Sequence, residues 1–203
     1  GRKVSVPVNL DVGKYVAEVI FNENSRYNGV STNALIEVLT TVEGIDVVSQ
    51  YGTTAQYFAI FTDSSGKALA NADVKFTIDG KTYTVKTLLN GISKVNIKYA
   101  PGKYVMEAYN PVTGQKAYNT IFIFKKLMEN KDIATYYGAG QAYRVRAYGD
   151  DGNPVGAGKI VTFNVNGKTY KIKTDKNGYA TCKVNLKPKT YVITASFEGF
   201  KVS

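Results

Sequence analysis

Histidine and tryptophan are absent from this 203-residue sequence, and cysteine occurs only once. Without histidine the chain lacks the commonest general base and the commonest metal ligand. The usual serine and cysteine triads are therefore excluded, and a single cysteine allows neither an internal disulfide nor a cysteine metal site. We expect no catalytic, cofactor-binding or metal-binding residues, and we interpret the chain as a non-enzyme.

Long apolar runs and targeting segments are missing as well. No stretch has the pattern of a signal peptide, a transit peptide or a membrane span, so we expect no membrane insertion in this segment. The chain begins with Gly1 rather than Met. This start indicates a processed product or a fragment, with any export signal or anchor outside it.

The residues that are present are typical of a folded β protein. Hydrophobic residues make up 44% of the chain, charged residues 21% and aromatic residues 12%. This is a globular composition, not a disordered one. The sixteen tyrosines suit strands that bury one face and keep a polar tip in water.

The net charge of +10 lies in the later part of the chain, because residues 1–43 hold four basic and five acidic groups. Most basic residues are lysines spaced along strand-like runs. That spacing is typical of solvated strand faces and protected edges. A surface for anionic wall polymers or glycans is the alternative. No recognition helix or arginine cluster is visible, so we expect no nucleic-acid partner.

An internal repeat is the main signal. Residues 49–69 match 135–155 at a constant offset of 86, and residues 74–87 match 161–174 at an offset of 87. Near the N-terminus, 13-GKYVAEVIF-21 matches the stretch that begins at Gly102. The predicted parts are the second half of a repeat (1–43), a complete repeat (44–126) and a repeat that lacks its last strand (127–203).

Each repeat has the pattern of antiparallel strands. Apolar residues alternate in 57–63 and 143–150, the period of a half-buried strand. Asp79-Gly80 and Asn166-Gly167 each predict a two-residue hairpin turn. Residues 31–44 could form a short helix, but we interpret them as a strand. The predicted fold is all-β, with tandem immunoglobulin-like antiparallel β-sandwich repeats.

The motifs of the repeats resemble a known family. The chain looks like the Ig-like repeats of adhesin-like surface proteins of methanogenic archaea, and is more distantly similar to invasin-type and CnaB-like repeats. This resemblance implies an extracellular location at the cell surface or cell wall. The residues that carry it are Tyr137-Gly138, Gly152-Asn153-Pro154-Val155, Asn166-Gly167-Lys168-Thr169-Tyr170, Asp175, Asn177-Gly178 and Tyr191.

Two groups of residues could suggest chemistry but have simpler interpretations. Cys182 aligns with Val95 on an inward-facing strand position, where a buried cysteine behaves as a small hydrophobe. Asp150 and Asp151 could suggest a Ca²⁺ site, but the aligned stretch beginning at Asp63 keeps one carboxylate only. A turn explains that acidic pair better.

The resemblance to CnaB-like domains implies a possible crosslink, because such domains often join a lysine to an asparagine on the last strand. Asn33 and Asn119 occupy equivalent last-strand positions and are the candidates. Lys75 and Lys159 fall near the same strand of their repeats but do not align. A hydrogen-bonding role in turns or caps is the alternative for the asparagines.

The last repeat ends early, because Ser203 aligns with Tyr118, one residue before the position of Asn119. Two explanations stay open. The chain is one window on a longer polypeptide, or the open repeat is completed by strand complementation with another copy.

We interpret the chain as an extracellular structural or adhesive module that mediates attachment or acts as a stalk. Its partners would be neighbouring repeats or copies of itself, and an anionic glycan or cell-wall polymer. Loops 22–29 and 110–116 differ most between copies and are candidate binding loops. The alternative is a glycan- or wall-binding accessory module of a surface enzyme.

Overall fold

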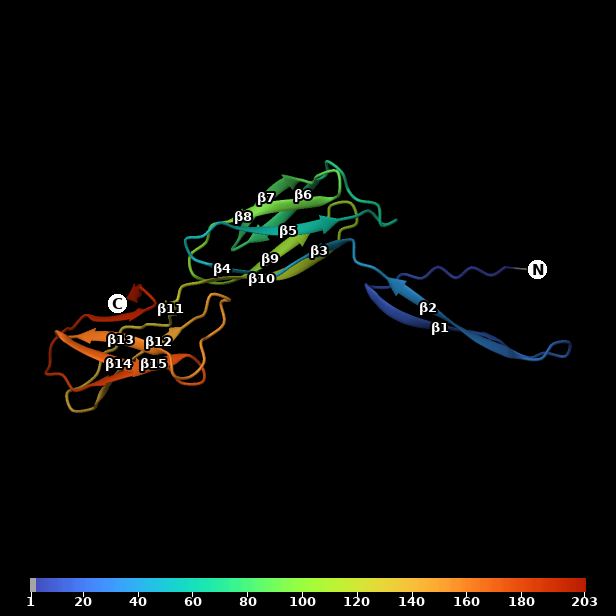
Figure 1. Cartoon of the computed structure of the whole chain (residues 1–203). Helices are drawn as coiled ribbons and strands as arrows, with labels where there is room; N and C mark the ends of the chain where they lie inside the picture. The colour runs from blue at the N-terminus through green and yellow to red at the C-terminus, as the bar shows by residue number, and fades with distance from the viewer. Residues whose placement is uncertain (1–2) are drawn as a thin grey trace.

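The computed structural model describes residues 3–203, and within them it contains strands and no helix. It follows that no helix in this range could cross a membrane. The strands form a hairpin, a first sandwich and a second sandwich, which follow one another from the N-terminus to the C-terminus (Figure 1). The predicted all-β class is confirmed.

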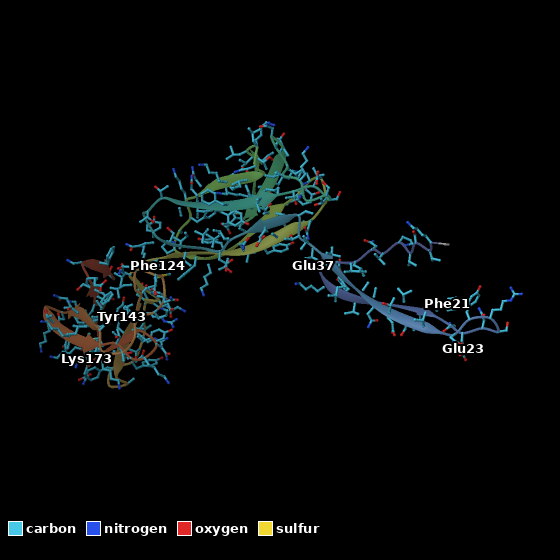
Figure 2. All side chains as sticks on the ribbon, turned by 45° about the vertical axis from the view of Figure 1, so that its right-hand side comes forward. Phe21, Glu23, Glu37, Phe124, Tyr143 and Lys173 are labelled. Carbon is cyan, nitrogen blue, oxygen red and sulfur yellow. The ribbon has the colours of Figure 1, made fainter. Side chains whose placement is uncertain are left out.

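The hairpin consists of β1 (Gly13–Phe21) and β2 (Val30–Val38), which pair antiparallel over their full length. Residues 31–38, which had helical potential, therefore form a strand as predicted. The hairpin projects away from the first sandwich, with side chains on both of its faces in solvent (Figure 2). Its exposed apolar side chains include Val16, Val19, Ile20, Phe21 and Leu35.

The first sandwich packs a three-stranded sheet against a five-stranded one. The smaller sheet has the order β3 (Val42–Gly44), β5 (Ala55–Phe61), β8 (Ile92–Ile97). The larger has the order β4 (Val47–Gln50), β10 (Lys116–Phe124), β9 (Gly102–Tyr109), β6 (Asp73–Ile78), β7 (Lys81–Lys86).

The second sandwich repeats this plan. One sheet has the order β11 (Leu127–Met128), β12 (Gln141–Ala147), β15 (Tyr179–Val184). The other has the order β14 (Lys168–Lys173), β13 (Ile160–Val165), β16 (Ile193–Phe197), β17 (Phe200–Val202).

Strand alternation builds both cores, as the sequence predicts. In β6 the side chains of Val74, Phe76 and Ile78 are buried between exposed or half-buried neighbours. The ring of Tyr57 meets the ring of Phe76 edge-on at 5.4 Å. The same edge-on pair recurs in the second sandwich between Tyr143 and Phe163, at 6.2 Å.

The predicted hairpin turns form at both repeats. Asp79 and Gly80 have φ values of 50° and 72° between β6 and β7. Asn166 and Gly167 have 49° and 76° between β13 and β14. Two consecutive positive φ values define the type I′ turn, which fits the twist of antiparallel strands.

The parallel pairing of β4 with β10 was not predicted. Val47 to Gln50 lie in register with Ile121 to Phe124. In chain order β4 and β10 are the first and last strands of the larger sheet, and they run side by side in the same direction. The aligned residues 133–136 form no strand. β17 corresponds only to the start of β10, so within residues 3–203 no strand pairs with this segment.

Candidate functional site

The outward face of β12 and β15 carries a cluster of basic and aromatic side chains in the second sandwich. Alternation buries Tyr143, Val145 and Ala147 of β12, so Arg144 and Arg146 point outward. On the neighbouring strand, the residues that point outward are Tyr179, Thr181 and Lys183. We call this surface the Arg144 face.

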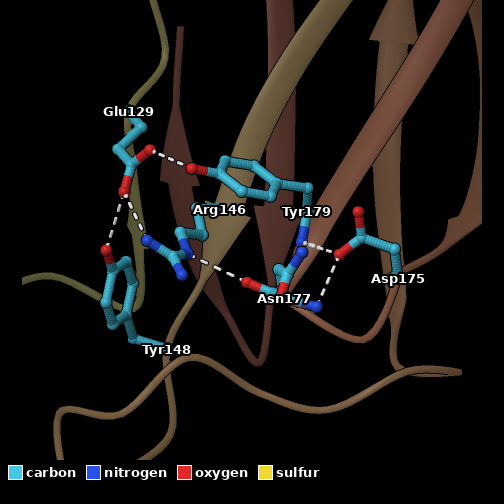
Figure 3. A network of polar contacts seen from close by, with 6 residues as sticks. All are labelled: Glu129, Arg146, Tyr148, Asp175, Asn177 and Tyr179. Atoms are coloured by element: carbon cyan, nitrogen blue, oxygen red, sulfur yellow. Dashed lines mark hydrogen bonds and ion pairs between the residues drawn. The ribbon is translucent and has the colours of Figure 1, made fainter.

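Glu129 organises one end of this face (Figure 3). Its carboxylate accepts hydrogen bonds from the hydroxyls of Tyr179 at 2.7 Å and Tyr148 at 2.9 Å, and from Arg146 at 3.2 Å. Arg146 also donates from Nε to the carbonyl oxygen of Asn177 at 2.9 Å. The charge of Arg146 is therefore matched by Glu129.

The ionisation of Glu129 follows from these contacts. Burial acts to raise the pKa of Glu129, but the hydrogen bonds from Tyr179, Tyr148 and Arg146 outweigh it and hold the pKa below its usual value. The same contacts raise the pKa of Tyr148 to about 12, with burial as the largest cause. Glu129 thus stays a carboxylate that fixes the two tyrosines and Arg146.

Arg144 is placed differently. Its guanidinium carbon lies 4.3 Å from the centre of the Tyr179 ring, and Arg146 approaches the same ring at 4.8 Å. Arg144 is exposed, and among residues 3–203 it forms no ion pair. The face therefore presents one guanidinium that is held by stacking and whose charge is not balanced by a partner.

The first sandwich has a different surface at the same place. Phe58 aligns with Arg144 and Ile60 with Arg146, and their side chains are 40% and 42% exposed. Ile92 aligns with Tyr179. Sequence reasoning did not single out the Arg144 face. The signal was available in the aligned repeats, where two arginines replace two apolar residues on outward positions.

Asn119, one of the two crosslink candidates, ties β10 to the opposite sheet. Its side-chain oxygen accepts a hydrogen bond from the buried Tyr57 hydroxyl at 2.7 Å. Its amide donates to the carbonyl oxygen of Gly44 at 3.1 Å and to the Asp46 carboxylate at 3.2 Å. A Cβ at Gly44 would lie 1.9 Å from the Tyr57 hydroxyl, so only glycine fits there.

The corresponding tyrosine of the second sandwich has no such partner. The hydroxyl of Tyr143 is buried and makes no hydrogen bond within residues 3–203. The Asn130 side chain lies near it but donates to the carbonyl oxygen of Ser203 at 3.1 Å. Within residues 3–203 no residue of the second sandwich aligns with Asn119. Asn33, the other crosslink candidate, is exposed on β2.

A compact joint connects the two sandwiches, because only Lys125 and Lys126 separate β10 from β11. Lys125 lies over the Tyr51 ring of the first sandwich at 5.2 Å. Lys126 is only 4% exposed, and it pairs with Asp150 and, at 2.9 Å, with Glu198 of the second sandwich. Each linker lysine is thus held by one of the two sandwiches.

Gly152 completes the joint from the second sandwich. It is buried, and a Cβ there would lie 2.4 Å from Val48 and 3.1 Å from the Phe124 ring, both in the first sandwich. The Tyr148 ring adds aromatic contacts with Phe122 at 6.0 Å and Phe124 at 6.4 Å. The turn of one sandwich therefore packs directly against the end of the other.

The remaining residues of interest have structural roles. Cys182 is fully buried in the second core, as predicted, and burial raises the pKa of its thiol. Asp151 accepts hydrogen bonds from the backbone and side chain of Asn153, as the turn interpretation requires. Within the described residues no cluster of acidic or cysteine side chains could hold a metal ion.

No protein-family model matches the sequence, and no curated protein matches it significantly. Solved structures with similar architecture include one from a 1.5-MDa bacterial ice-binding adhesin, with 17% identity over 93% of this chain and 71% of that one and a TM-score of 0.32. The bacterial integrin-binding protein invasin aligns with 19% identity over 80% of this chain and 38% of its own, with a TM-score of 0.37.

A tandem pair of titin immunoglobulin domains aligns with 17% identity over 79% of this chain and 89% of that one, with a TM-score of 0.36. These similarities concern architecture only. The two packed antiparallel sheets of each sandwich are the architecture of an Ig-like β-sandwich, and the likeness to archaeal surface repeats stays a resemblance of sequence.

The two core tyrosines provide a matched pair of substitutions. Tyr57→Phe should lower the free energy of unfolding by about 1–2 kcal/mol, because Asn119 loses its hydrogen-bond donor. Tyr143→Phe should change it by less than about 0.5 kcal/mol or stabilise the protein, because its hydroxyl has no partner to lose. Denaturant titrations followed by circular dichroism measure both. An equal loss in the two variants would contradict this assignment.

The crosslink hypothesis has a direct test. The Asn119 amide is engaged by Tyr57, Gly44 and Asp46, and no lysine donates to it. We therefore expect the intact mass of the denatured protein to equal that calculated from the sequence. A lysine–asparagine bond releases ammonia, so each crosslink would lower the mass by one ammonia.

Proposed function

We propose that this chain is an extracellular structural and adhesive module, in which sandwiches joined end to end form a stalk of a repetitive cell-surface protein. The joint around Gly152 is the observation that carries the proposal. A two-residue linker with packed contacts on both sides keeps one sandwich at a set orientation to the next. Repeats that contact only their neighbours allow length to change with copy number.

The composition of the chain and its resemblance to surface repeats support an extracellular location. The motifs resemble repeats of surface adhesins, and the described residues contain no metal cluster or cysteine pair on which stability could depend. Each sandwich instead has its own core of alternating apolar residues. A module of this kind needs no cofactor and tolerates variation of its outward faces.

A second candidate function is an accessory module that binds an anionic glycan or wall polymer for a surface enzyme. The Arg144 face favours this candidate, because it places an unbalanced guanidinium beside a tyrosine on a solvent-facing sheet. Binding and a stalk role are compatible, since Arg144 points outward on β12 and lies outside the joint around Gly152, although Tyr148 contributes to both regions.

We also propose that copies associate by strand addition. The buried Tyr143 hydroxyl has no hydrogen-bond partner within the described residues, whereas Tyr57 has Asn119. The hairpin strand β2 carries Asn33 at the position that aligns with Asn119, and both of its faces are exposed. The β2 strand of a second copy would bring an asparagine amide to the Tyr143 hydroxyl.

The joint can be tested with two aligned glycines. Gly66 and Gly152 both have positive φ, 82° and 74°, so replacement by alanine costs about 1–2 kcal/mol at either position. Only the new Cβ at Gly152 would meet the first sandwich, because nothing lies within 4 Å at Gly66. We expect Gly152→Ala alone to broaden the distance distribution in small-angle X-ray scattering. Identical profiles for the two variants would argue against a packed joint.

Strand addition predicts self-association that depends on Asn33. Sedimentation velocity of the whole chain at rising concentration should show larger species, and these should weaken in Asn33→Ala. Asn22→Ala, an exposed change in the same hairpin, should associate like the parent chain. A chain that stays monomeric throughout the concentration series would overturn this proposal.

A further inference from the structure

The Arg144 face combines three features that a flat binding site for anions requires. It presents an arginine without an acidic partner, a ring that holds the guanidinium in place, and a further cation on the next strand. The pairing of β12 with β15 sets Arg144 opposite Thr181, with Lys183 as the next outward residue along β15.

Stacking on Tyr179 restricts the guanidinium of Arg144 before any ligand arrives. The Tyr179 ring is itself fixed by its hydroxyl bond to Glu129 at 2.7 Å, and Glu129 is fixed by Tyr148 and Arg146. A side chain that is held in place loses less conformational entropy on binding. The planar edge of a guanidinium matches the two oxygens of a carboxylate.

The ion pairs on this face leave positive charge unbalanced, and an anionic ligand could neutralise it. Arg146 is matched by Glu129, whereas Arg144 and Lys183 form no ion pair within the described residues. The Thr181 hydroxyl between them offers a neutral hydrogen-bonding group. Two cations around a hydroxyl suit a polymer that carries both acidic and hydroxyl groups.

We propose that the Arg144 face binds a polysaccharide that carries carboxylates, with Arg144 and Lys183 as the carboxylate-binding residues and Tyr179 as the positioning residue. This deepens the proposed function, on which the choice of an extracellular polymer rests. The side chains of Arg144, Tyr179 and Lys183 project from the face of the sheet, although β15 is the edge strand of that sheet. An extended peptide would add to an edge through its backbone, whereas a polymer can lie across a face.

Aligned positions make the site specific to the second sandwich. Phe58, Ile92 and Asn96 stand where Arg144, Tyr179 and Lys183 stand in the second copy. The first sandwich therefore has the same scaffold without the arginine and the tyrosine ring, and its own outward cation, Lys94, stands where Thr181 stands in the second. One copy binds by this mechanism and the other does not.

Calorimetric titration of the whole chain with polygalacturonate tests the proposal. Arg144→Gln should weaken binding about tenfold, the loss expected for a charge-assisted pair of hydrogen bonds. Arg144→Lys should also weaken it, because a lysine lacks the planar fork. Lys168→Gln removes the same charge from an exposed position at the start of β14 in the other sheet, and we expect it to bind like the parent chain.

Each alternative outcome has a definite meaning. Equal losses in Arg144→Gln and Lys168→Gln would overturn the site, because the attraction would depend on net charge alone. Tighter binding of dextran sulfate would overturn the carboxylate assignment, and tighter binding of polyglutamate would overturn the polysaccharide. The scattering profile of Arg144→Gln should match that of the parent chain, so failure of binding would leave the stalk proposal intact.

Discussion

The hydrogen bond between Tyr57 and Asn119 connects the two sheets of the first sandwich at its last strand. Tyr57 lies in the smaller sheet and Asn119 in the larger one, and their contact is possible only because Gly44 has no side chain. With β10 held there, its end is fixed beside β4, and the linker lysines leave the sandwich in a defined direction. This bond thus adds to the pairing with β9 and β4 in fixing the strand from which the linker leads to the next sandwich.

Much of the fold could be predicted from the sequence, because strand alternation and turn chemistry are local. Asp79-Gly80 and Asn166-Gly167 form the expected turns, and the repeat offset gives the number of sandwiches. The parallel pairing of β4 with β10 could not be predicted, because it joins segments about seventy residues apart with no turn between them to set the register.

The surface was harder to predict than the core. An apolar residue in an alternating strand indicates a buried position. An outward arginine such as Arg144 cannot be told apart in the sequence from any other solvated strand residue. The partners of Glu129 come from the end of β12 and from β15, so no local spacing in the sequence connects Glu129 with all of them. Asn119 was recognised as special from its repeat position, but its tyrosine partner was not.

The parallel arrangement of β4 and β10 has a mechanical consequence. The chain enters the first sandwich close to β4 and leaves it from β10, and these strands lie side by side in the same direction. Tension applied along the molecule pulls the two strands past each other, so their hydrogen bonds are loaded together and not one at a time. The two-residue linker adds almost no slack before this load arrives. Force along the molecule would therefore meet a shear clamp in the first sandwich, at a strand that the Tyr57–Asn119 contact also anchors.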